Sequence, residues 1–280
     1  MRVRSVLITG CSSGIGRCLA EGLQARGYRV FATARKAIDV AALSAAGFES
    51  LALDLASSTS IQDAVSAVRE RSNDTLYALI NNGAYGQPGA VEDLSRDALR
   101  AQFETNVFGT HELTARLLPV FRAHNRGRII QISSLLGLVC LPYRGAYNAS
   151  KFALEALSDT LRLELRDTDI RVSLIEPGPI ATRFRTNAFV AFQAHIDPAQ
   201  SSHAVRYAAM QRRLLAQGTI PFTLPATAVL RKVIKALEAK RPQARYGVTL
   251  PTHFFALLRR LLPSRALDRI LAGVGGSGRR

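Results

Sequence analysis

The feature that most constrains the fold of this chain is a regular alternation of short apolar segments with segments of helical periodicity. The apolar segments are nearly continuous, which is typical of strands buried on both faces of a sheet. Strands that alternate with helices form a parallel sheet, because each helix crosses one face and returns the chain to the same end. We therefore expect an α/β fold with a doubly wound parallel sheet of about seven strands and helices on both faces. The expected strands are 4–10, 28–34, 50–55, 76–82, 127–134, 170–178 and 244–250.

The alternation stops after the sixth strand. Residues 181–224 contain scattered aromatic side chains and no clear strand, and they are too many for a structureless loop, so we expect a partly helical substrate lid. The stretch 252–280 is expected to be a basic C-terminal helical extension, in which Pro263 divides the amphipathic segment 252–271. We expect the whole chain, 1–280, to form a single domain. The expected helices are 14–27, 37–47, 58–72, 95–124, 147–166 and 226–240.

The positive charge of the chain lies mainly in its last quarter. The formal net charge is +16, and residues 201–280 contain 15 Lys/Arg and 2 Asp/Glu, which gives +13. Such a region attracts nucleic acid or anionic lipid. It lacks the interleaved aromatic and basic residues that stack nucleobases, so we expect no nucleic-acid partner. Peripheral membrane contact through 252–271 is one interpretation, and an arginine-rich, solvated surface is the simpler alternative.

Three sequence features predict a cytoplasmic protein. No apolar run reaches the roughly 18 residues that span a bilayer, and the N-terminus leads directly into a strand instead of a signal-peptide core. The cysteines Cys11, Cys18 and Cys140 have no metal-ligand spacing and cannot all pair, so we expect reduced thiols and no metal site.

The first strand leads into the glycine-rich sequence TGCSSGIG, with Gly10, Gly14 and Gly16. Glycines at a sharp turn from a strand into a helix let the backbone approach a pyrophosphate, and the N-terminus of the helix attracts its charge. The spacing GxxxGxG differs from the standard GxGxxG. Because the turn follows the first strand of an alternating chain, we interpret it as a Rossmann-type dinucleotide site.

The end of the second strand indicates which dinucleotide binds. NAD sites place an acidic residue there for the ribose 2′-hydroxyl, whereas this chain has Arg35 and Lys36. These cations would bind a 2′-phosphate, which predicts NADP; a solvated basic turn is the alternative. Asp54, at the end of the third strand, is predicted to accept the adenine amino group, although an aspartate at such a position is also a common helix N-cap.

Further motifs in fixed order make the chain resemble the short-chain dehydrogenase/reductases over about residues 4–185. They are NNGA at 81–84, TNVFG at 105–109, ISS at 132–134, YNASK at 147–151 and PG at 177–178. More narrowly, the chain resembles bacterial NADP-dependent aldehyde/carbonyl reductases, which are similar to hydroxysteroid and retinol dehydrogenases. One departure is NNGA where the family usually has NNAG, which we expect to change the backbone locally without loss of function.

The resemblance implies a catalytic set of Asn106, Ser134, Tyr147 and Lys151. Tyr147 and Lys151 are one helical turn apart and share a face, so we expect the ammonium to lower the pKa of the phenol and make it an acid–base catalyst. Ser134 would stabilise the substrate oxygen, and Asn106 would bend its helix and hold a water. The predicted cofactor contacts are Gly10, Ser12, Ser13, Gly14, Ile15, Gly16, Arg35, Lys36, Asp54, Leu55, Asn81, Tyr147, Lys151, Pro177, Gly178, Ile180 and Thr182.

These features together predict an NADP(H)-dependent oxidoreductase that interconverts an apolar aldehyde or ketone and its alcohol. The apolar substrate is inferred from the aromatic residues of the lid, and reduction is the expected direction. A catalytically silent NADP-sensing regulator and a hydroxysteroid/retinol-type dehydrogenase working in the oxidative direction are the alternatives. The resemblance also implies a homodimer or homotetramer.

Overall fold

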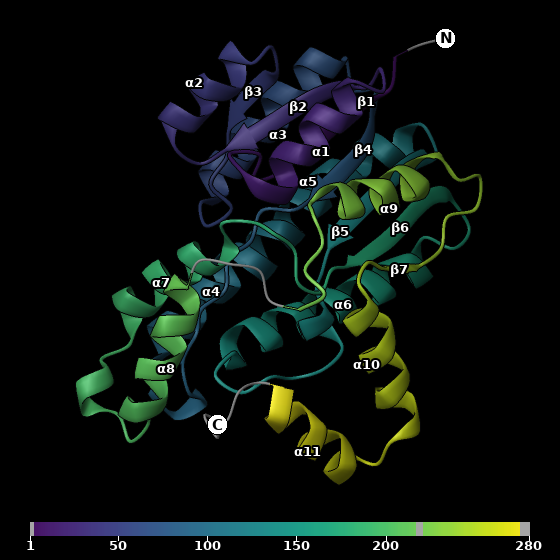
Figure 1. The fold of residues 1–280 in the computed structure, drawn as a ribbon. Coiled ribbons are helices and arrows are strands. Elements are labelled where there is room, and N and C mark those ends of the chain that lie inside the picture. Colours follow the sequence, from purple (N-terminus) through teal and green to yellow (C-terminus); the bar gives the residue numbers. More distant parts are fainter. Residues whose placement is uncertain (1–2, 217–220, 275–280) are drawn as a thin grey trace.

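The computed structural model describes residues 3–216 and 221–274, and its centre is a seven-stranded sheet in the order β3-β2-β1-β4-β5-β6-β7 (Figure 1). Every pair of neighbouring strands is parallel, which confirms the expected doubly wound sheet. The strands are β1 (Ser5–Ile8), β2 (Arg29–Ala34), β3 (Glu49–Ala52), β4 (Leu76–Asn81), β5 (Arg126–Ile132), β6 (Asp169–Glu176) and β7 (Arg245–Gly247).

Helices cover both faces of the sheet. The expected long helix 95–124 is divided into α4 and α5 by a π-helical turn, η2 (Glu104–Gly109), and a short 3-10 turn, η3 (Leu135–Gly137), follows β5. The α-helices are α1 (Gly14–Gln24), α2 (Ala37–Ala45), α3 (Ser58–Ser72), α4 (Arg96–Phe103), α5 (Thr110–Ala123), α6 (Gly145–Glu164), α7 (Phe184–His195), α8 (Ala204–Leu215), α9 (Thr227–Glu238), α10 (Leu250–Leu261) and α11 (Ser264–Val274).

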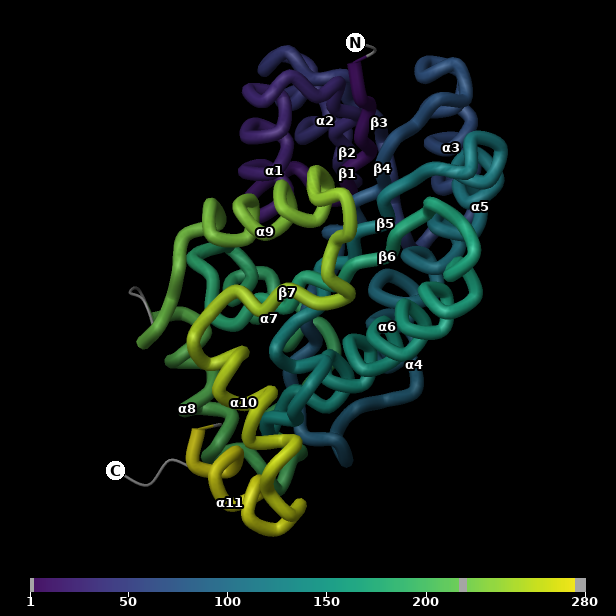
Figure 2. Tube along the Cα trace, turned by 90° about the vertical axis from the view of Figure 1, so that its right-hand side faces the viewer, coloured from purple at the N-terminus to yellow at the C-terminus, as the bar shows by residue number. Residues whose placement is uncertain are grey.

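The alternation of side chains along the strands produces two apolar layers. In β1, Val6 and Ile8 pack in one layer with residues of α1 and α9, whereas Leu7 packs in the other with residues of α3 and α5. Figure 2 shows α1 and α9 on one side of the sheet and α3 and α5 on the other. The strand order reverses between β1 and β4. In such folds ligands bind at this switch point, in the crevice outside the carboxyl ends of the strands.

The segment expected to be a lid contains α7 and α8, which pack on the body of the protein. Phe192 and Tyr207 are fully buried in a small core with Leu94 and Ala146. The Tyr207 hydroxyl accepts a hydrogen bond from the backbone N–H of Ala90 at 2.8 Å. Residues 217–220 of the expected lid lie outside the described residues.

The C-terminal extension consists of α10 and α11, and they are separated at Pro263 as expected. Phe255 and Leu271 anchor the two helices in a core with Leu135 and Val139. Residues 275–280 of the expected extension lie outside the described residues. Within the described part of the chain, no helix is both long and apolar enough to cross a membrane.

Gly109 tests how closely the π-helical turn η2 packs on the loop after β3. A Cβ atom on Gly109 would lie 1.8 Å from the Leu55 carbonyl oxygen. We expect Gly109→Ala to lower the free energy of unfolding by about 3 kcal/mol, because two backbone segments must separate. Gly273 lies in α11, and apart from its chain neighbours and its own helix backbone no described residue has an atom within 4 Å of the Cβ position, so Gly273→Ala should be neutral or stabilising by up to about 1 kcal/mol. Urea unfolding measures both; equal effects would contradict this account.

Candidate active site

The glycine turn at the end of β1 has the backbone conformation expected for a dinucleotide site. Gly10 and Gly14 have φ angles of +71° and +57°, which other residues rarely adopt. Gly16 is limited by space, because its Cβ would lie 2.1 Å from the Gly10 carbonyl oxygen. Ser12, Ser13 and Ile15 complete the turn and the start of α1, and the Ser13 side chain makes no capping hydrogen bond.

Asn82 fixes this turn and was not among the predicted site residues. Its side-chain amide donates to the carbonyl oxygens of Thr9 at 2.9 Å and Gly10 at 3.2 Å. The Thr9 hydroxyl in return accepts from the backbone N–H groups of Asn82 at 2.9 Å and Gly83 at 2.7 Å. The signal in the sequence was its place in the motif NNGA, directly after a buried strand.

Asn81, which was predicted to contact the cofactor, directs its side chain to α5 instead of the glycine turn. Its amide donates to the Thr114 hydroxyl at 2.9 Å, and the residue is 4% exposed. The Asn81 side-chain oxygen is buried and has no hydrogen-bond partner among the described residues.

The loop after β6 brings a second group of predicted residues to the crevice. Thr182 lies over the glycine turn, because a Cβ on Gly14 would be 3.1 Å from its methyl group. The Pro177 carbonyl oxygen accepts from the Leu135 N–H at 2.8 Å, and Ile180 pairs with Leu224. Gly178 is packed so tightly that its Cβ would lie 2.1 Å from the Thr249 hydroxyl.

The residues predicted to bind the adenosine end lie after β2 and β3. Arg35 and Lys36 are exposed at the start of α2, and neither forms an ion pair with a described residue. Asp54 accepts from the Ala56 N–H at 3.0 Å. It does not cap α3, whose N-cap is Ser57, so the capping alternative is wrong. Leu55 is buried below this loop.

Tyr147 and Lys151 lie in the first two turns of α6, and both side chains are buried, at 7% and 3% exposure. The Lys151 ammonium donates to the Ile132 carbonyl oxygen at 2.8 Å and lies 5.8 Å from the centre of the Tyr147 ring. The structure thus brings the two residues together on one face of α6.

The electrostatics of this pair differ from the prediction. Burial raises the pKa of Tyr147 to about 12, and the opposing influences are the hydrogen bond with Ser134 and the charge of Arg144, not Lys151. Burial also lowers the pKa of Lys151 to about 8, against the opposing charge of Glu155. The expectation that Lys151 lowers the pKa of Tyr147 is therefore wrong in this structure, because desolvation of the phenol is the largest influence and Lys151 is not among the groups that oppose it.

The two serines after β5 face opposite directions, as the strand periodicity predicts. Ser134 reaches the Tyr147 hydroxyl and also accepts from the Leu136 N–H at 3.1 Å. Ser133 lies on the other side, where its hydroxyl would be 2.9 Å from a Cβ on Gly137.

Asn106 lies within the π-helical turn, so the predicted helix irregularity is present. Its side-chain amide donates to the Tyr85 carbonyl oxygen at 2.9 Å and the Ser150 hydroxyl at 3.1 Å, and its oxygen accepts from the Tyr85 N–H at 3.1 Å. Asn106 therefore connects the loop after β4 to α6.

A side chain of the lid covers the Tyr147 ring. Phe184, at the start of α7, packs edge-to-face on Tyr147 with 5.3 Å between ring centres. Gly86 leaves room for Phe184, because a Cβ there would lie 2.8 Å from the Phe184 ring. A mainly apolar hollow of about 490 Å³ lies nearby, between α11 and the N-terminus of α6, but its lining does not include Tyr147 or Ser134. The side chains, not this hollow, therefore define the candidate site.

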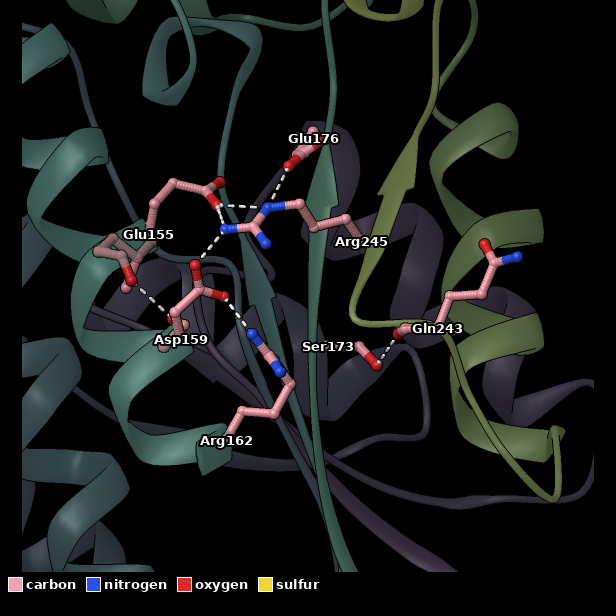
Figure 3. A network of polar contacts seen from close by, with 9 residues as sticks. Glu155, Asp159, Arg162, Ser173, Glu176, Gln243 and Arg245 are labelled. Carbon is pink, nitrogen blue, oxygen red and sulfur yellow. Dashed lines mark hydrogen bonds and ion pairs between the residues drawn. The ribbon is translucent and has the colours of Figure 1, made fainter. Parts of the chain in front are cut away.

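Beside Lys151, a partly buried charge network surrounds Arg245 of β7 (Figure 3). Its guanidinium forms ion pairs with Glu155 at 3.0 Å, Asp159 at 2.6 Å and Glu176 at 3.2 Å. The side chains of Glu155 and Glu176 are only 8% and 5% exposed. Burial raises the pKa of Glu176 to about 7, and the nearby charge of Glu155 adds to this effect.

Comparison with known proteins identifies the family. A family model described as "short chain dehydrogenase" matches residues 4–191. The chain is 44% identical over 270 residues to "Uncharacterized oxidoreductase YbbO" of Escherichia coli (strain K12), covering 96% of this chain and 94% of that protein. It is 33% identical over 276 residues to "NADPH-dependent 3-dehydrocapnine reductase" of Ornithobacterium rhinotracheale, covering 96% of each. The crystal structure of a short chain dehydrogenase/reductase from Burkholderia phymatum in complex with NAD matches with a TM-score of 0.77 and 25% identity, covering 96% of this chain and 95% of that one.

The chain therefore belongs to the short-chain dehydrogenase/reductase family and is an oxidoreductase that acts on CH–OH groups. The family predicted from the motifs is thereby confirmed, and the matched region agrees with the predicted one.

The network around Arg245 predicts a pH-dependent stability effect. Arg245→Leu removes the ion-pair partner of two buried carboxylates, Glu155 and Glu176, so we expect a loss of about 3–5 kcal/mol in the free energy of unfolding at pH 8. The loss should be smaller at pH 5.5. A carboxyl whose pKa is raised in the folded state binds a proton more readily there, so its penalty falls as the pH is lowered.

The matched control is Arg162, which pairs with the half-exposed Asp159 at 2.9 Å. Arg162→Leu should cost at most about 1 kcal/mol with little difference between the two pH values. Urea unfolding at pH 5.5 and pH 8 measures both variants. An Arg245→Leu loss that does not change with pH would show that the carboxyls do not cause it.

Proposed function

We propose that the protein is an NADP(H)-dependent carbonyl reductase that converts an apolar aldehyde or ketone to its alcohol, with Asn106, Ser134, Tyr147 and Lys151 as the catalytic set. The observation that carries the proposal is the proximity of the Tyr147 and Ser134 hydroxyls, with the Lys151 ammonium buried one helical turn away. A proton donor and an oxyanion-stabilising hydroxyl at one point are what carbonyl reduction requires.

Each side chain has a distinct role in the proposed reaction. Ser134 donates a hydrogen bond to the substrate oxygen as negative charge develops there, and Tyr147 transfers its proton to that oxygen. Asn106 fixes the loop after β4 relative to α6 through its contacts with Tyr85 and Ser150. When bound, the cofactor supplies the hydride that is added to the carbonyl carbon.

The pKa directions favour the reductive direction. With a pKa of about 12, Tyr147 keeps its proton at neutral pH and is ready to donate it. With a pKa of about 8, Lys151 remains largely protonated at neutral pH and provides positive charge close to the tyrosine. In the oxidative direction Tyr147 would first have to lose its proton, which its burial opposes.

The chain's residues fit a bound NADP. The positive φ angles of Gly10 and Gly14 give the glycine turn the backbone shape that a pyrophosphate site needs, and Thr182 from the loop after β6 lies over the same turn. Pro177, Gly178 and Ile180 would hold the nicotinamide end together with Thr182, and Lys151 would hold its ribose.

Arg35 and Lys36 are exposed at the N-terminus of α2, where they would bind a 2′-phosphate.

The surroundings of Tyr147 support an apolar substrate. The edge-to-face contact of Phe184 with Tyr147 places an aromatic side chain of the lid at the reaction point. One relative, the NADPH-dependent 3-dehydrocapnine reductase of Ornithobacterium rhinotracheale, agrees with both the cofactor and the direction proposed here.

Two other functions remain to be distinguished by experiment. A catalytically silent NADP-sensing regulator would bind the dinucleotide without turnover. A hydroxysteroid/retinol-type dehydrogenase would oxidise alcohols with NADP⁺ faster than it reduces carbonyl compounds with NADPH. Initial rates for both directions with a panel of apolar aldehydes, ketones and alcohols separate the three functions.

Tyr147→Phe tests the catalytic proposal. The variant should fold and bind NADPH, yet lose turnover by about 1000-fold, because the proton donor is removed while the ring contact with Phe184 is kept. Tyr143→Phe is the matched control: this tyrosine lies before α6, and its hydroxyl accepts from Arg206 at 2.8 Å. It should keep most of the activity. Substantial turnover by Tyr147→Phe would exclude the proposed proton donor.

Arg35→Asp tests the choice of cofactor. A carboxylate at this position repels a 2′-phosphate and can accept from a ribose 2′-hydroxyl, so NADPH should bind about 100-fold more weakly while NADH binds at least as well. Arg71→Asp, an exposed charge change at the end of α3, should leave both affinities unchanged. Fluorescence titration with each dinucleotide measures them. Equal weakening by the two variants would mean that only the overall charge matters.

A further inference from the structure

The outer surface of α10 is an exposed apolar stripe. It consists of Leu250, Phe254, Leu257 and Leu261, whose exposed fractions are 72%, 54%, 54% and 68%. The spacings of four, three and four residues place these side chains on one side of the helix. Exposing four neighbouring large apolar side chains to water is energetically unfavourable. Such a patch indicates a binding site for an apolar partner.

The opposite side of α10 is fixed to the protein, so the helix cannot rotate to bury the stripe. Phe255 is buried in the core that also contains Leu271 of α11. The Arg259 guanidinium donates to the Leu138 carbonyl oxygen at 2.6 Å and lies over the Phe152 ring at 5.1 Å. The two helices lie together at the end of the molecule opposite the N-terminus in Figures 1 and 2.

Positive charge accompanies the stripe. The residues from Leu250 to Val274 include four arginines and one acid, Asp268. All four are exposed, and none of them forms an ion pair with a described residue. An apolar row beside unpaired arginines is the pattern of helices that lie in the interface of a membrane.

The charge also indicates which partner covers the stripe. In a symmetric contact between two copies of this chain, the same arginine-rich patch would face itself and repel. An anionic bilayer surface instead offers phosphate groups to the arginines and acyl chains to the stripe.

We propose that α10 docks the protein on anionic phospholipid membranes, with the stripe in the acyl-chain boundary and the arginines of α10 and α11 at the headgroups. The contact is peripheral. It does not depend on the catalytic proposal, because it uses none of the residues of the active site.

Vesicle flotation of the full chain tests this docking. The wild-type protein should float with phosphatidylglycerol/phosphatidylcholine vesicles and much less with pure phosphatidylcholine vesicles. The double change Phe254→Glu and Leu257→Glu should weaken binding at least 10-fold, because charged groups must then enter the interface. Arg260→Gln and Arg265→Gln should each weaken it about fivefold and reduce its dependence on salt.

The matched control is Val205→Glu, at an apolar position on α8 that is 86% exposed. It should bind vesicles like the wild-type protein, and near-UV circular dichroism checks that every variant is folded. Failure of the wild-type protein to float with anionic vesicles, or equal binding by the double variant, would overturn the proposal. Light scattering detects the competing partner: wild-type dimers that become monomers in the double variant, without vesicle binding, would assign the stripe to a second copy of the chain.

Discussion

The burial of the Lys151 ammonium is the interaction on which the rest of the candidate site depends. A charge that is 3% exposed needs compensation, and the structure provides it in two ways. The Ile132 carbonyl oxygen at the end of β5 accepts a hydrogen bond from it. Glu155, one turn further along α6, supplies the opposite charge. Glu155 is itself buried and forms an ion pair with Arg245 of β7, the edge strand of the sheet. Arg245 therefore stabilises the carboxylate that in turn stabilises Lys151.

Burial of the phenol likewise explains why the pKa of Tyr147 is raised, whereas the sequence predicted a lowered value. Sequence reasoning considers only the ammonium one helical turn away, which favours the phenolate and would lower the pKa of the phenol. In the folded protein the loss of water around the phenol is the larger effect, and the hydrogen bond with Ser134 only partly opposes it. The result is a phenol that retains its proton, which fits a proton donor in reduction.

The parallel sheet brings residues from distant parts of the chain to one edge. Asn82 follows β4 yet fixes the glycine turn after β1, Thr182 follows β6 yet lies over Gly14, and Asn106 connects the loop after β4 to α6. These contacts form because parallel strands all end at the same edge. The lid and the C-terminal helices then extend beyond this edge, where Phe184 covers Tyr147.

The sequence by itself determined the sheet, the glycine turn and the family, because these depend on local periodicity and on motifs whose residues are close together along the chain. It also predicted the break between α10 and α11, since proline interrupts a helix locally. The tertiary structure alone decided the directions in which side chains point. Asn81 faces α5 whereas Asn82 holds the glycine turn, and Arg245 pairs with two carboxylates that are distant in the sequence. The apolar stripe of α10 faces outward. The physical reason is that the burial and pairing of a side chain depend on residues far apart in the sequence. A periodic pattern shows that a helix has an apolar face, but it does not show what covers that face.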